Sequence, residues 1–433
     1  MASRAPRPPA PPLPLPRAQV YDVSEWKGHP GGRVLYTVAG SDATDTFRAF
    51  HAAGTDKTLE RFYVGDLAGT PPSLTPFELE YRAALAQLKA AGLFRASLGY
   101  YAWKFGSTTA LLGASVAACA SARSTAGVAG GALLLALFWQ QCGWLAHDFA
   151  HNQVFRDRRL NDAAVLLIGN VYQGFSMGWW KNKHNTHHAI PNLHESSEAK
   201  HDGDPDIDTI PFLAWSVRLA SKAAPGGESD SPATRWTLAH QAALYFPILL
   251  FARWTWAVES AKYAFSSAPA SPLRYPVSER LGLLAHYAWV AALALYATGG
   301  SPAGALAFIA FAQCAGGILL AIPFGVGHNG MPVYDADKRP GFAELQVTTT
   351  RNVDEWAGTP LVGWFMGGLH LQVEHHLFPT VPRHNLAAVR AVIQPLAAKH
   401  GVPYRATSLW EGTREVLTHL DGIADVVKSF PAA

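Results

Sequence analysis

Four apolar segments constrain the fold of this 433-residue chain more than any other feature. Each approaches the roughly 20 apolar residues that a helix needs to cross the hydrocarbon core of a bilayer. Very short connections join the first segment to the second and the third to the fourth, which predicts two helical hairpins. The segments cover residues 98–120, 127–146, 281–298 and 303–326.

The composition agrees with a membrane protein. Hydrophobic residues make up 49% of the chain and charged residues only 15%, whereas soluble domains carry about 25% charged residues. The net charge of +3 is too small and too dispersed to predict nucleic-acid binding. The three cysteines lie in apolar stretches without a CxxC pair, which argues against a disulfide framework or a cysteine-ligated metal.

Two further apolar runs are ambiguous. Residues 163–180 are broken by glycines, and residues 238–257 are rich in Trp and Tyr and carry Arg253. Aromatic rings and a snorkelling arginine are typical of the membrane surface. We therefore expect both runs to be interfacial helices that do not cross the bilayer.

The chain ahead of the first span divides into three parts. Residues 1–18 are rich in Pro and Arg and lack the apolar core of a secretory signal, so they are predicted to be a disordered tail. Arginines without acidic residues also occur in plastid transit peptides, which is the alternative for this segment. Residues 19–70 have the pattern of a small polar α+β domain, and residues 71–97 that of a linker with an amphipathic helix. Residues 98–433 form the predicted membrane domain.

Three of the motifs in the predicted membrane domain place histidines at helical spacing. Side chains three or four residues apart lie on one face of a helix, so each motif aims its imidazoles at one point. Seven histidines exceed the six ligands of one octahedral ion, which favours two metal ions; imidazole suits zinc, copper, nickel and iron alike. The motifs contain His147 and His151, then His184, His187 and His188, and finally Gln372, His375 and His376.

The motifs also predict an orientation. They follow the second and the fourth span, so all of them share one membrane face only if the ambiguous runs do not cross. The stretch 147–280 contains thirteen Lys and Arg, whereas the two hairpin tips contain only Arg123. The positive-inside rule therefore predicts that the histidine face is cytosolic.

Several residues near the motifs have open roles. His328 follows the fourth span and is either an eighth histidine ligand or a polar cap of that helix. Asp148 and Glu374 stand beside candidate ligands and either orient imidazoles or are exposed. The acidic run at positions 202, 204, 206 and 208 fails the EF-hand pattern, so we expect solvated or orienting carboxylates. Lys181 and Lys183 either bind an anionic headgroup or anchor the chain at the membrane.

The N-terminal unit has a motif of its own. The turn His29-Pro30-Gly31-Gly32, followed by Phe47 and His51, resembles cytochrome b5. The resemblance implies that His29 and His51 are the axial ligands of haem b, with residues 19–70 as the haem-binding domain. Two axial imidazoles leave no open position on the iron, which suits electron transfer.

A haem unit joined to HxxxH, HxxHH and QxxHH motifs resembles the front-end fatty-acid desaturases, and looks closest to algal enzymes that act at the Δ6 position. The shared segments include residues 143–148, 180–185 and 346–352. The resemblance implies a mainly α-helical, polytopic membrane domain with four spans and a cytosolic di-iron site. It implies a ligand set of His147, His151, His184, His187, His188, His375 and His376, with His328 as an extra ligand and Gln372 at a ligand-equivalent position.

The same resemblance implies the reaction and the partners. Electrons would pass from cytochrome b5 reductase through the haem to two iron ions, and O2 would be consumed. A cis double bond would form between an existing one and the carboxyl end of a polyunsaturated fatty acyl chain, carried on CoA or a phospholipid. We expect the acyl chain in a narrow tunnel between the spans, and the protein in the endoplasmic reticulum membrane, or alternatively in a plastid membrane.

Other functions remain as alternatives at this point. A Δ5, Δ8 or Δ4 front-end desaturase, a sphingolipid long-chain-base desaturase and a fatty-acid hydroxylase would use the same metals. A membrane zinc hydrolase commonly carries HExxH, which is absent. A tethered electron carrier would need neither the histidine motifs nor more than one span.

Overall fold

In a computed structural model, the structure describes residues 18–24, 26, 28–52, 54–68, 74–196, 203–267, 269 and 272–431. The predicted tail, apart from Ala18, and part of the predicted linker lie outside these residues.

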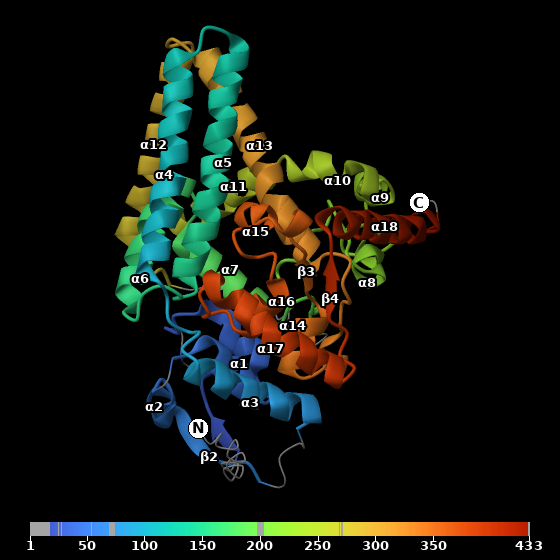
Figure 1. The fold of residues 1–433 in the computed structure, drawn as a ribbon. Coiled ribbons are helices and arrows are strands. Elements are labelled where there is room, and N and C mark those ends of the chain that lie inside the picture. Colours follow the sequence, from blue (N-terminus) through green and yellow to red (C-terminus); the bar gives the residue numbers. More distant parts are fainter. Residues whose placement is uncertain are drawn as a thin grey trace.

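Four long helices form one end of the molecule and stand side by side (Figure 1). Both predicted hairpins are present, and their two tips lie at the same end (Figure 1). Among the described residues, three helices are long and apolar enough to cross a membrane: α5, α12 and α13. The remaining one, α4, has 24 residues and packs along α5, but it is less apolar. The bounds are α4 Leu98–Ser121, α5 Thr125–Ala150, α12 Pro276–Ala297 and α13 Pro302–His328.

Serines at the hairpin tips and helix starts explain where these helices begin. Ser97, Ser124 and Ser301 each accept a hydrogen bond from the backbone N–H three residues ahead, at the starts of α4, α5 and α13. Such caps satisfy donors that have no partner inside the helix. Gly131 of α5 faces Cys119 of α4, where a Cβ atom would come within 2.4 Å of the sulfur, so this glycine allows the hairpin to close.

Neither ambiguous run crosses beside the long helices. The first lies at their base, and the second lies beside the middle of α13 (Figure 1). The first forms the end of α6, the π-helical segment η3 and the start of α7, with a left-handed turn at Gly174 (φ 88°). The second spans the end of α9, α10 and the start of α11, and α10 lies across the long helices (Figure 1). The bounds are α6 Arg158–Val165, η3 Leu166–Gln173, α7 Met177–Ala189, α8 Val217–Ala220, η4 Ser221–Ala223, α9 Pro232–Ala239, α10 Gln241–Leu249 and α11 Ala252–Phe265.

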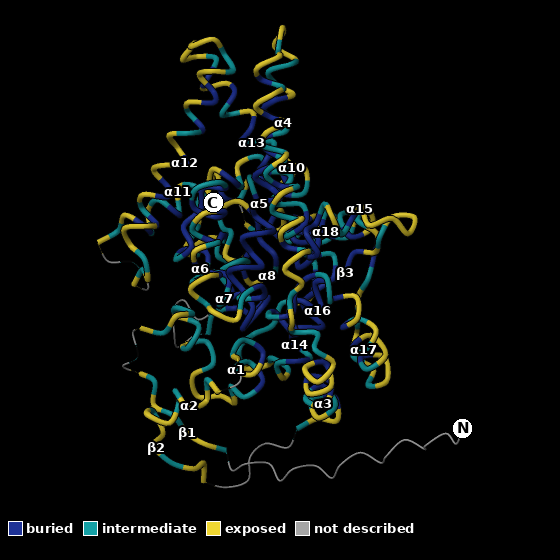
Figure 2. The backbone as a smooth tube through the Cα atoms, turned by 60° about the vertical axis from the view of Figure 1, so that its left-hand side comes forward, coloured by how far each residue is buried: buried dark blue, intermediate teal, exposed yellow. Residues whose placement is uncertain are grey.

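The C-terminal part wraps around the same base. The buried residues concentrate there, whereas the far ends of the long helices are largely exposed (Figure 2). Strands β3 and β4 pair in parallel. Strand β3 follows α14 in the chain, and β4 precedes the final helix, α18. The bounds are η5 Ala336–Lys338, α14 Phe342–Thr348, β3 Arg351–Val353, η6 Trp356–Gly358, α15 Leu361–Phe365, α16 Gln372–Leu377, η7 Arg383–Asn385, α17 Leu386–Lys399, β4 Arg405–Thr407 and α18 Leu409–Lys428.

The N-terminal unit is a small α+β fold that lies below this base (Figure 1). Its two strands pair antiparallel, and the short helices lie between them in the chain. The amphipathic helix α3 follows, and its apolar face packs on α17 through Tyr81 and Leu85. The bounds are β1 Gln19–Tyr21, η1 Gly32–Val38, α1 Thr44–Phe50, α2 Asp56–Leu59, η2 Glu60–Phe62, β2 Tyr63–Asp66 and α3 Pro76–Ala90.

Candidate metal centre and haem site

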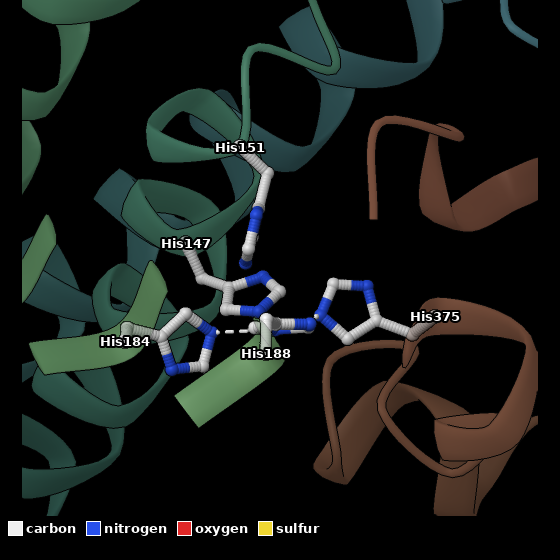
Figure 3. A group of neighbouring side chains, drawn as sticks. All are labelled: His147, His151, His184, His188 and His375. Carbon is white, nitrogen blue, oxygen red and sulfur yellow. Dashed lines mark hydrogen bonds between the residues drawn. The ribbon is translucent and has the colours of Figure 1, made fainter. Parts of the chain in front are cut away.

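Five histidines from three helices converge at the base of the long helices. The first motif ends α5, the second lies on α7, and the third lies on α16. Each histidine offers one ring nitrogen, and these nitrogens all lie within 4.8 Å of one another. Figure 3 shows their rings pointing toward one another. This first group contains His147, His151, His184, His188 and His375, all buried.

A second group of histidines lies beside the first. His187, His328 and His376 form it by the same criterion of ring nitrogens within 4.8 Å, and all three are buried. The rings of His188 and His376 stack at 4.0 Å between centroids, so the two groups are in contact. The histidine motif on α7 therefore serves both groups: His184 and His188 face the first, and His187 faces the second.

Several of the nitrogens that meet at the centre have no hydrogen-bond partner within the described residues. Nε2 of His188 lies 3.0 Å from Nε2 of His184 and 3.1 Å from Nε2 of His375. Buried Nε2 atoms without a hydrogen-bond partner within the described residues belong to His147, His151 and His376. Burial, followed by the charges of neighbouring histidines, lowers the pKa of His184, His188 and His375 well below the usual value. Converging neutral imidazoles are the donor set that a metal ion needs.

Three of the outward ring nitrogens lie within hydrogen-bond distance of side-chain oxygens. Nδ1 of His187 lies 3.0 Å from a carboxylate oxygen of Asp204, and Nδ1 of His376 lies 2.9 Å from Oε1 of Gln346. Such bonds set the tautomer, so that Nε2 presents its lone pair inward. Asp148 lies 3.3 Å from Nδ1 of His147. The sequence analysis assigned no role to Gln346, although it begins the segment 346–352.

Neither alternative for Glu374, an orienting carboxylate or an exposed one, is correct. Its side chain is buried and accepts hydrogen bonds from Asn352 Nδ2 at 2.8 Å and from the Tyr404 hydroxyl at 2.5 Å. It makes no hydrogen bond to an imidazole within the described chain. Gln372 does reach the second group: its Nε2 lies 2.8 Å from Nε2 of His328, and its buried Oε1 has no partner.

His29 and His51 face each other in the N-terminal unit. Their ring centroids are 6.0 Å apart. Bonds of about 2 Å from each imidazole to a metal ion between them would give roughly this separation. Both histidines line a cavity of about 650 Å³ with the apolar side chains of Val34, Leu35 and Phe47, a size within the usual range for cofactor sites. The residues present therefore fit a bis-histidine haem.

Comparisons with known proteins agree with both sites. A family model described as fatty acid desaturase matches residues 124–408, and one described as cytochrome b5-like heme/steroid binding domain matches residues 14–68. The chain belongs to the fatty acid desaturase family. Members of this family hold two iron ions, and the N-terminal domain is of the haem-binding cytochrome b5 type.

Similar proteins span several regioselectivities. An acyl-lipid (9-3)-desaturase of Physcomitrium patens is 39% identical, over 94% of this chain and 74% of its own. A Delta(8)-fatty-acid desaturase of Euglena gracilis is 32% identical over 96% of each chain. A Delta(6)-fatty-acid desaturase of Caenorhabditis elegans is 31% identical, over 93% of this chain and 94% of its own. The chain is thus similar to front-end desaturases with fused cytochrome b5 domains.

The desaturase's two lysines beside the second motif have internal partners. Nζ of Lys181 lies 2.5 Å from a carboxylate oxygen of Asp162, and Nζ of Lys183 lies 3.2 Å from one of Asp206. The expected roles in headgroup binding or membrane anchoring stay predictions. As expected for the acidic run, Asp204 orients the ring of His187 and Asp206 pairs with Lys183. Position 202 lies outside the described residues.

The haem domain of the desaturase docks against its metal centre. Nε and Nη2 of Arg82 in α3 donate hydrogen bonds to the carboxylate of Asp45 in α1, at 2.8 and 2.9 Å. At the end of α1, the ring of Phe50 lies edge-on to His188 with centroids 6.1 Å apart. The residue next to the candidate haem ligand His51 thus contacts a member of the first histidine group.

A second cavity of about 230 Å³ adjoins the second histidine group. Among the residues that line it are His187 and His328 at one end, aromatic side chains such as Trp256 and Phe324, and the buried Arg253. It lies between α7, α10, α11 and α13. Of the four expected spans only α13 lines this cavity, so it differs from the expected tunnel between the spans.

Proposed function

We propose that the protein is a Δ6-type front-end desaturase that uses O2 and electrons from its own haem domain to insert a cis double bond into a polyunsaturated fatty acyl chain. The adjacent histidine groups beside an apolar cavity carry this proposal. The similarity to a Delta(6)-fatty-acid desaturase over nearly the full length of both chains supports the Δ6 position.

We infer that each histidine group holds one iron ion. His147, His151, His184, His188 and His375 would hold one ion, and His187, His328 and His376 the other. The partnerless Oε1 of Gln372 supports a place for this amide beside the second ion. When bound, the iron pair supplies the oxidising power that an unactivated methylene C–H bond requires.

The reaction balances with two external electrons. Two adjacent acyl carbons each lose one hydrogen, and these two hydrogens, two electrons and two protons reduce O2 to two water molecules. The protein's own residues hold the imidazoles in place, exclude bulk water and fix which carbons face the centre. The 230 Å³ cavity is the proposed site of the acyl chain beyond the new double bond.

The proposed electron route starts at cytochrome b5 reductase and passes through the haem between His29 and His51. The contact of Phe50 with His188 supports a direct passage to the metal centre. The excess of Lys and Arg on the histidine face supports a multi-pass protein with this face and the haem domain in the cytosol. The proposed location is the endoplasmic reticulum membrane, with a plastid membrane as the alternative.

The names of two relatives support a choice between the two acyl carriers. Proteins from Physcomitrium patens and Borago officinalis, 39% and 30% identical, are named acyl-lipid (9-3)-desaturases. These names favour a lipid-bound acyl substrate over acyl-CoA for this chain. The 32% identity to a Delta(8)-fatty-acid desaturase supports Δ8 as a second candidate, and Δ5, Δ4 and long-chain-base desaturation remain alternatives.

Product analysis in yeast tests this function. Cells that express the chain receive linoleic, α-linolenic, or C20 and C22 polyunsaturated acids in separate cultures, and mass spectrometry locates new double bonds. A new Δ6 bond in the C18 acids is the expected result. A bond at Δ8, Δ5 or Δ4 would correct the position, and an unsaturated sphingoid base without any new fatty acid would overturn the substrate class.

A further inference from the structure

Arg158 is a half-buried cation without an anionic partner at the cavity that fits the haem. It occupies the first turn of α6, directly after the capping residue Asp157. Its side chain lines the 650 Å³ cavity together with His29 and His51, although it belongs to the membrane domain. It makes no hydrogen bond or ion pair with any residue that the structure describes.

Other charges around Arg158 do not neutralise it. Lys181 and Arg274 also line the cavity, and both pair with Asp162, at 2.5 and 3.1 Å. The Tyr275 hydroxyl reaches the same carboxylate at 3.3 Å. The second carboxylate of the cavity wall, Glu279, accepts hydrogen bonds from Ser176 and from the Gly178 backbone. Two of the three cations thus share one carboxylate, and hydrogen bonds occupy the other, so neither carboxylate pairs with Arg158.

Arg158 lies close to both haem-ligand histidines. Burial lowers the pKa of His29 to about 4, and the charges of His51 and Arg158 contribute to this shift. The pKa of His51 is also lowered, first by burial, and Arg158 again contributes. An unpaired, half-buried guanidinium in the wall of this cavity favours an anionic ligand, because leaving a desolvated charge uncompensated is costly.

We propose that Arg158 binds a propionate of the haem across the domain boundary, so that the haem is held by axial ligands from one domain and by a carboxylate contact to the other. Haem b carries two propionate carboxylates at one edge, and a guanidinium matches a carboxylate with paired N–H donors. Haem binding then fastens the two domains together, next to the contact of Phe50 with His188. This inference rests on the haem-binding part of the proposed function.

The test compares haem retention in full-length protein purified in detergent. Arg158→Gln removes the positive charge, so we expect haem to transfer to apomyoglobin about tenfold faster. This is the effect expected from the loss of one charge-assisted hydrogen bond. The haem midpoint potential of this variant is expected to fall, because the lost cation favoured the reduced state. Arg158→Lys is expected to lie between the variant and the original protein, because the charge stays and the paired donors are lost.

The matched control is Arg159→Gln, the same change at an exposed neighbour on the same helix. It is expected to leave haem release and potential unchanged. A second test weakens docking by Arg82→Gln. If the propionate contact bridges the domains, the effects of Arg82→Gln and Arg158→Gln on haem release are less than additive.

Two results separate failure of this inference from failure of the function. Haem release and potential that are the same in Arg158→Gln and Arg159→Gln would overturn the propionate contact. A loss of affinity for the substrate lipid with haem unchanged would also overturn it, and would assign Arg158 to a lipid phosphate. Original protein that binds no haem at all would contradict the haem part of the proposed function itself.

Discussion

At the candidate metal centre, His187 and His376 each direct one ring nitrogen toward the centre and hydrogen-bond the other to a protein side chain. For His187 the protein side is Asp204, whose carboxylate also accepts hydrogen bonds from the backbone N–H groups of Asn192 and Asp206, at 2.7 and 2.9 Å. The carboxylate is therefore fixed before it orients the ring. For His376 the same task falls to the amide of Gln346, which also donates to the His188 carbonyl at 3.0 Å.

Asp204→Asn tests this orientation. The amide can turn an N–H toward Nδ1 of His187, which would place the imidazole proton on Nε2 and remove a lone pair from the centre. We expect iron affinity to fall roughly 10–100-fold, as for other partners of metal-bound histidines. Iron per chain after dialysis against graded chelator measures it. Asp208→Asn, the same change at an exposed acid, is the control, and equal iron retention in the two variants would refute the role.

Helix α1 connects the two redox sites at the scale of secondary structure. It ends at Phe50, and the next residue is the candidate haem ligand His51, so one helix end presents one side chain to the histidine groups and the next to the proposed haem site. The Asp45–Arg82 pair holds this helix against α3. Helix α3 in turn packs on α17, which follows the third histidine motif.

Phe50→Ala removes the ring that lies between these sites. We expect slower reoxidation of the reduced haem in the presence of O2 and substrate, with the haem midpoint potential unchanged. Stopped-flow absorbance of the haem measures the rate. Phe50→Leu keeps an apolar contact, and we expect an intermediate rate. Reoxidation of the Ala variant at the original rate would show that electrons reach the metal centre without this ring.

Local patterns in the sequence predicted the hairpins and the histidine motifs well. Short connections dictate antiparallel neighbours, and the i, i+3 and i+4 spacing of His184, His187 and His188 dictates a shared helix face. The sequence could not show that His187 leaves its two neighbours for the second group, because His328 and His376 arrive from distant segments. The partners of Lys181, Lys183 and Glu374 were missed for the same reason.

At the scale of the whole molecule, the metal centre lies where the spanning helices meet the body below them. Histidines of α5 and α13 end two long helices, while α7 and α16 bring the rest from the base. The haem domain covers this centre from one side, and the 230 Å³ cavity approaches it between α13 and the interfacial helices. The arrangement separates the entry of electrons from the proposed position of the acyl chain.

Ala321→Phe tests the position of the acyl chain. Ala321 lines the cavity on α13, seven residues before His328 and therefore about 10 Å from it along the helix. A phenyl ring there would fill the cavity, so we expect loss of product from C18 and longer acids with iron and haem retained. Ala307→Phe, at an exposed site on the same helix, should keep activity. Full activity in Ala321→Phe would place the acyl chain elsewhere.

The most direct test of the central claim is the metal and haem content of the full-length chain purified without added metal. Two adjacent histidine groups and one bis-histidine cavity predict two iron ions outside the haem and one haem per chain. The prediction extends to His188→Ala, which should lose the non-haem iron and keep the haem. Zinc in place of iron, or a single non-haem metal ion per chain, would contradict a di-iron desaturase.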